Sequence, residues 1–159
     1  MRFLARSSPY LSLFAIDFAA GAVNPLLPYL TSSTDEFADI SAAGAAAVAV
    51  GNIASGYLAG IVSIRWLMTV WLLVAAAANA GTALAPSFGV LLLCRVFANL
   101  ADNWSLTQTL IDPNGSSAAV TGRATAAVLA GRVFGGVLGG LFTHGMGSAA
   151  TCYLCAGGL

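Results

Sequence analysis

Residues 66–85 read WLMTVWLLVAAAANAGTALA, twenty consecutive residues without a charged side chain. A helix rises about 1.5 Å per residue, so about 20 apolar residues cross the roughly 30 Å hydrocarbon core of a bilayer. The rest of the chain has the same character, because 58% of its 159 residues are apolar and only 8% are charged. An ordinary soluble domain has about 25% charged residues with which to cover its core. The sequence therefore predicts a membrane protein.

Further apolar runs lie on both sides of this stretch, separated by polar and turn-forming residues. They predict an all-α, polytopic membrane helix bundle with five complete transmembrane helices and a truncated sixth. The polar residues 31–36, with Asp39, are expected to form a loop, and Arg65 to mark a short turn. All of residues 1–159 then form one domain, with spans at about 10–30, 42–64, 66–85, 88–111 and 124–142 and a partial span at 149–159.

The arginines predict the orientation of these spans, because loops on the cytoplasmic side of a membrane are enriched in Arg and Lys. With the N-terminus inside, every arginine in a predicted loop or tail is cytoplasmic: Arg2, Arg6, Arg65 and Arg123. The outer loops then contain the acidic residues and the histidine: Asp35, Glu36, Asp39 and His144. We expect a multi-pass protein of the plasma membrane or an inner membrane, with a cytoplasmic N-terminus.

Four ionisable residues fall inside the predicted spans: Asp17, Arg95, Asp102 and Arg132. An ionisable residue in a span is costly, which makes it a functional hypothesis by default. Counting from the span ends puts the two acids and Arg132 at one depth, where they can share a polar pocket. The same count puts Arg95 nearer the outer side, at the level of Asn24 and Asn79.

These charges allow two interpretations. One is a pathway with a protonatable carboxylate, because burial favours a neutral aspartate while a neighbouring arginine favours the charged form. The other is a static ion-pair network that only fixes helix packing. Of the two acids, Asp17 is the preferred candidate for proton or cation coupling. Asp102 lies two helical turns from Arg95 on the same face, so permanent pairing is expected there.

Small residues spaced four apart predict close helix packing in the second and fifth spans. The second span contains two such pairs, Gly51 with Ser55 and Gly56 with Gly60. The fifth span repeats the spacing over three glycines and has two more beside them: Gly131, Gly135, Gly139, Gly136 and Gly140.

Three short motifs lie on the first predicted span, on the fourth, and in the loop after the fourth. In the first span, Asp17 precedes a P-x-x-P motif that begins at Pro25. In the fourth, the Leu-rich run LLLCRV contains Arg95, and the loop that follows carries Asp112 ten residues before Gly122.

The fifth span carries the most specific motif, G-x-x-x-G-G-x-x-G-G over residues 131–140. Together these motifs resemble those of the N-terminal six-helix half of the major facilitator superfamily. They are most similar to the drug:proton antiporter branch, which includes tetracycline exporters and whose signature is G-x-x-x-G-P-x-x-G-G. Gly136 stands here in place of that proline.

The stretch between the second and third spans departs from the family's pattern G-x-L-A-D-R-x-G-R-R, which begins here at Gly56. Gly60 replaces its Asp, Ile61 replaces its first Arg, and only Arg65 keeps a charge. The family latches its cytoplasmic gate with those charges, so this loop is interpreted as a degenerate gate. The family also has twelve helices in two halves, so a missing C-terminal half is expected. An end inside a sixth span would expose backbone groups to lipid, which implies truncation.

The resemblance implies proton-coupled export of a small organic solute by alternating access. It implies that Asp17 is the coupling carboxylate and that Arg95 organises the fourth helix. Asp102 and Arg132 would tune or neutralise the pocket, with Asn24 on the same pathway. The expected partners are the lipid bilayer, a small-molecule substrate and the proton.

Two alternatives stay open: a facilitator or uptake carrier of the same fold, and a non-transporting membrane protein that binds a partner. An enzyme is not expected, because the sequence has no recognisable nucleophile–base pair. Cys152 and Cys155 lack the four-ligand spacing of a zinc site, so no metal or other cofactor is expected. Six arginines balance six acids and there is no lysine, which leaves no basic surface for nucleic acid.

Overall fold

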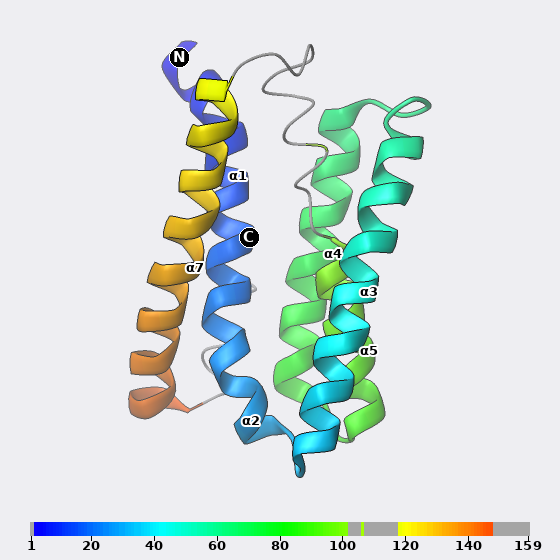
Figure 1. Ribbon diagram of the computed structural model, residues 1–159, viewed down its shortest axis with the longest axis vertical. Coiled ribbons are helices and arrows are strands. Elements are labelled where there is room, and N and C mark those ends of the chain that lie inside the picture. Colours follow the sequence, from blue (N-terminus) through cyan, green and yellow to red (C-terminus); the bar gives the residue numbers. More distant parts are fainter. Residues whose placement is uncertain (1, 102–105, 107–117, 148–159) are drawn as a thin grey trace.

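The computed structural model describes residues 2–101, 106 and 118–147, which form an all-α helical bundle (Figure 1). This confirms the predicted fold class, and this part of the chain contains no strand. The elements in chain order are α1 (Arg2–Val23), the 3₁₀ turn η1 (Asn24–Leu26), α2 (Leu27–Leu30), α3 (Thr34–Leu58), α4 (Ile64–Leu84), α5 (Phe88–Leu100) and α7 (Ala118–Met146).

Within the described residues, four segments are long and apolar enough to cross a membrane: Pro9–Leu30, Thr34–Leu58, Ile64–Leu84 and Ala118–Met146. Helix α5 is apolar as well, with 13 described residues. Helices of this length and composition indicate a membrane protein. The end of the predicted fourth span, the loop with Asp112 and the partial span at 149–159 lie outside the described residues.

The first predicted span is not one uninterrupted α-helix. Helix α1 ends at Val23, the chain passes through η1, and α2 follows from Leu27. Pro25 and Pro28 explain the change, because proline has no N–H with which to bond the preceding turn. The break leaves Asn24 at the junction between the two helices.

The polar run before α3 was predicted to be a loop, and that prediction is wrong from Thr34 onward. Ser33 has an extended backbone, and its Oγ accepts a hydrogen bond from the Glu36 N–H at 3.1 Å. The Glu36 carboxylate accepts two more, from the N–H and Oγ of Ser32, each at 2.7 Å. This capping satisfies backbone groups at the helix start. Asp35 and Glu36 in the first turn also face the positive end of the helix dipole.

The other helix ends also differ from the predicted boundaries. Helix α3 ends at Leu58, so Gly60 lies in the turn that joins α3 to α4, and its N–H donates to the Tyr57 carbonyl at 3.2 Å. Arg65 is the second residue of α4 and does not form the turn itself. Helix α7 extends to Met146, so His144 belongs to its last turn. Within a helix the backbone N–H and C=O groups hydrogen-bond to each other. This favours helices that continue past the ends of the apolar runs.

The helices form two groups (Figure 1). Helices α1 and α7 lie side by side and pack along their length, and α5 packs against both α3 and α4. Among the described residues the contacts between the groups are small, and they include those between α1 and α4 and between α2 and α3.

Helices α1 and α7 approach so closely because glycines line their contact. A Cβ atom on Gly131 would lie 2.5 Å from the Phe14 carbonyl oxygen, and one on Gly139 would lie 2.5 Å from the Ala22 Cα. A Cβ on Gly135 would come closer still to the Phe18 carbonyl oxygen. These three glycines are buried. Small residues at this spacing allow such backbone contacts between membrane helices.

Two glycines of the same motif lie beside this contact line. A Cβ on Gly136 would meet nothing closer than the Gly21 carbonyl oxygen at 3.8 Å, and one on Gly140 would meet nothing within 4 Å. The close approach therefore uses the glycines at every fourth residue of the motif, Gly131, Gly135 and Gly139, and leaves Gly136 and Gly140 unconstrained.

The second group uses one of the two pairs of small residues predicted in the second span, Gly51 with Ser55. A Cβ on Gly51 would lie 3.0 Å from the Leu100 carbonyl carbon of α5, and Ser55, one turn along, is fully buried. Gly56 has open space around it, with no atom within 4 Å of such a Cβ. Only Gly51 with Ser55 therefore faces the partner helix.

Candidate functional site

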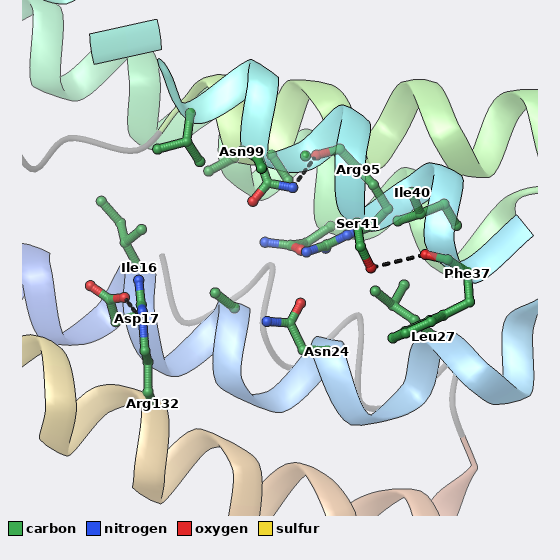
Figure 2. A pocket seen from close by; sticks show the side chains of 17 residues that line it. Ile16, Asp17, Asn24, Leu27, Phe37, Ile40, Ser41, Arg95, Asn99 and Arg132 are labelled. Carbon is green, nitrogen blue, oxygen red and sulfur yellow. Dashed lines mark hydrogen bonds and ion pairs between the residues drawn. The ribbon is translucent and has the colours of Figure 1, made fainter. Parts of the chain in front are cut away.

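A cavity of about 510 Å³ lies between the two helix groups (Figure 2). This volume falls within the range of about 300–1,000 Å³ that is typical of small-molecule sites. Its wall includes apolar side chains from α1, α2 and α3 and seven polar ones: Asp17, Asn24, Ser41, Asn79, Arg95, Asn99 and Arg132.

One end of the cavity contains an ion pair between α1 and α7. The Arg132 Nε donates to the Asp17 Oδ1 at 2.7 Å. Asp17 is buried, with 8% of its surface exposed, whereas the Arg132 side chain is 59% exposed. The depth count put these two residues at one level, and they are in contact.

The glycine contact positions this pair. Gly131 precedes Arg132, and a Cβ on Gly131 would lie 3.1 Å from the Asp17 Cβ. The absence of a side chain there lets α7 approach α1 closely enough for Arg132 to reach the carboxylate. A charge-assisted hydrogen bond of this length is strong where water is scarce, although exposure of the arginine weakens it.

A second polar cluster lies around Arg95 of α5, of which 2% is exposed. Its Nη1 donates to the Asn79 Oδ1 of α4 at 3.1 Å. One turn along α5, the Asn99 Nδ2 donates to the Arg95 carbonyl at 2.8 Å. A guanidinium stays protonated in proteins, so Arg95 places a permanent positive charge in the cavity wall.

Asn99 was not among the residues singled out from the sequence. It lies four residues after Arg95 and therefore on the same face of α5, which is the signal that could have revealed it. Gly44 of α3 makes room for it, because a Cβ there would lie 2.8 Å from the Asn99 Nδ2.

The structure brings four of the predicted pathway residues to one cavity: Asp17, Asn24, Arg95 and Arg132. Asn24 is exposed at the helix break, and its amide faces the cavity (Figure 2). Asp102 lies outside the described residues. The predicted gate residues Gly56, Gly60 and Arg65 are not among the described residues of the cavity wall.

No family model, curated protein or solved structure matches this chain. The site is therefore interpreted from its own geometry. Within the described part of the chain, no group of three or more His, Cys, Asp or Glu side chains is placed to hold a metal ion. The polar groups that face the cavity are guanidiniums, amides, a hydroxyl and a carboxylate, which suit a polar or charged organic molecule.

Proposed function

We propose that this chain is a multi-pass protein of the plasma membrane or an inner membrane and forms part of a proton-coupled secondary transporter for a small organic solute. Its N-terminus would be cytoplasmic, as the arginine distribution predicts. The observation that carries the proposal is the Asp17–Arg132 ion pair in the wall of a 510 Å³ cavity between apolar helices. The sequence resemblance to the drug:proton antiporters adds the expectation of efflux in exchange for protons, with a second six-helix half completing the carrier.

The chemistry of the pair supports proton coupling. When Asp17 is charged, it holds Arg132 against α1 at 2.7 Å. When Asp17 takes up a proton, the attraction between the two charges is lost and the charge of the cavity wall rises by one. A charged solute in the cavity then binds with different affinities to the ionised and the protonated forms of Asp17. This dependence of solute affinity on proton binding is the thermodynamic requirement for coupled transport.

The packing supports a relative movement of the two helix groups. Each group is joined internally by backbone contacts at Gly135 or Gly51, while the contacts between the groups are small. Rigid units that meet over a small area around a central cavity suit an alternating-access mechanism.

The test is solute flux in proteoliposomes that contain the full chain, with a pH gradient imposed in either direction. The probes are ethidium, a cation, and 1-naphthalenesulfonate, an anion that does not cross lipid readily. We expect at least one probe to accumulate, with accumulation lost when the gradient is dissipated. Asp17→Asn should abolish it, whereas Asp35→Asn, an exposed acid in the first turn of α3, should not.

The direction of the gradient separates the remaining alternatives. Accumulation in vesicles that are acidic inside supports antiport, and accumulation with the acid outside supports an uptake carrier. Flux that ignores the gradient supports a facilitator and contradicts proton coupling. An absence of flux for both probes, together with a fixed partner on purification, supports a non-transporting interaction protein.

A further inference from the structure

The charged groups on the described cavity wall are unequal in number. They are two guanidiniums, Arg95 and Arg132, and one carboxylate, Asp17. The guanidiniums stay protonated, so these three groups carry a positive excess even when Asp17 is ionised. Protonation of Asp17 increases this excess.

Hydrogen-bond donors face the same space. Arg132 uses its Nε–H for Asp17, but a guanidinium has further N–H groups, and this side chain lines the cavity and is 59% exposed. The amide of Asn24 also faces the cavity, as does that of Asn99 (Figure 2). The planar N–H groups of an arginine match the paired oxygens of a carboxylate or sulfonate.

The part of the cavity away from the Asp17–Arg132 pair is mainly apolar, and the hydroxyl of Ser41 there donates to the Phe37 carbonyl at 2.9 Å. Leu27 and Ile40 are buried, and Phe37 lies beside them (Figure 2). One cavity thus combines a cationic, donor-rich end with an apolar end.

We infer that the cavity binds an amphipathic organic anion, whose negative group lies towards Arg132, Arg95 and Asn24 and whose apolar part packs against Leu27, Phe37 and Ile40. This inference rests on the proposed function, because the bound anion would be the transported solute. It also sets the sign of coupling. Protonation of Asp17 makes the wall more positive, so the proton and the anion favour each other's binding. Positive coupling of this kind belongs to co-transport, in which the proton and the anion cross together, so this inference selects the uptake-carrier alternative over the antiport that the sequence resemblance implies.

The charged neighbours of Asp17 follow from the helices around α1. Helices α7 and α4 and the turn η1 pack against it. Their ionisable residues are Arg123, Arg132 and His144 of α7 and Arg65 of α4. Of these four residues, Arg132 alone is among the described residues that line the cavity. Arg95 of α5 lines the cavity as well.

The test is equilibrium binding to the full chain in nanodiscs, with empty nanodiscs as the blank. Three probes share one aromatic body and differ in charge: 1-naphthalenesulfonate, the neutral 1-naphthalenesulfonamide and the cation 1-naphthylmethylammonium. We expect the sulfonate to bind about tenfold more tightly than the other two, the effect of one charge-assisted contact. Its affinity should rise as the pH is lowered.

Three variants test the assigned groups. Arg132→Gln should weaken sulfonate binding about tenfold, whereas Arg123→Gln, exposed on the same helix and not among the described lining residues, should not change it. Asp17→Asn mimics the protonated acid and should strengthen sulfonate binding and remove its pH dependence. Should Arg132→Gln fail to fold, Asn24→Ala, which removes an exposed side chain, should still weaken the sulfonate several-fold.

Equal binding of the three probes, preference for the cation, or weaker sulfonate binding by Asp17→Asn would each overturn the inference. These results are distinct from failure of the proposed function. Sulfonate selectivity without gradient-driven flux would remove proton-coupled transport and leave the anion site, whereas gradient-driven flux of ethidium alone would do the reverse.

Discussion

Helices α1 and α7 contact each other backbone to backbone at three glycines, Gly131, Gly135 and Gly139. The packing of α3, α4 and α5 differs. It combines a close backbone approach at Gly51 with contacts between apolar side chains, such as Ile40 and Leu91. In the first group, the residues that set the packing adjoin the residues of the site, because Gly131 precedes Arg132. In the second group, Arg95 lies well away in sequence from Gly51. The ion pair therefore depends directly on the spacing of α1 and α7, while the buried Arg95 depends on its own hydrogen bonds.

The largest effect is expected from filling the α1–α7 contact. Gly135→Leu would force a side chain into the Phe18 backbone and should destabilise the protein by about 3 kcal/mol or more. The matched control is Gly140→Leu on the same helix, where a Cβ meets nothing within 4 Å. Thermal unfolding followed by tryptophan fluorescence measures both. Equal melting temperatures for the two variants would contradict the glycine contact.

Removal of the buried arginine comes next. Arg95→Met deletes the hydrogen bond to Asn79 and leaves that buried amide oxygen without its donor, which should cost about 2 kcal/mol. Arg123→Met, at an exposed position of α7, should change stability by less than about 0.5 kcal/mol. The same unfolding assay gives the difference, and a stable Arg95→Met protein would show that the second helix group does not need this cluster.

A smaller coupling is expected between Asp17 and Arg132, because the arginine is 59% exposed and water screens the pair. A double-mutant cycle with Asp17→Asn and Arg132→Gln should give an interaction of about 1 kcal/mol. A value of several kcal/mol would instead favour the interpretation of a static structural link between α1 and α7.

The smallest effect is expected in the connection between the two groups. Ser33→Ala removes the cap of α3 and should cost about 1 kcal/mol or less. Faster hydrogen exchange at the Glu36 amide is the local readout. Thr69→Ala is the control, because its hydroxyl bonds only within its own helix, to the Arg65 carbonyl. Unchanged exchange in Ser33→Ala would rule out a capping role.

Some features were predictable because they depend on nearby residues alone. The apolar runs determine helices, since a chain in lipid must satisfy its backbone groups within the segment. The start of α3 also depends on nearby residues, because Ser33 and Glu36 carry a local capping signal, so the prediction of a loop through Glu36 overlooked a signal that the sequence contains. The break at Asn24 follows from two nearby prolines in the same way.

An all-α chain of apolar helices follows from the residue pattern alone, and counting depth along those helices was enough to put Asp17 level with Arg132. The face of each helix that meets a partner became known from the packing of the helices in three dimensions. The motif contains both Gly135 and Gly136, yet only the first contacts α1, and Asn99 enters the cavity wall because Gly44 lies opposite. The helical period fixes which residues share a face, but the choice of the buried face depends on packing between segments far apart in the chain.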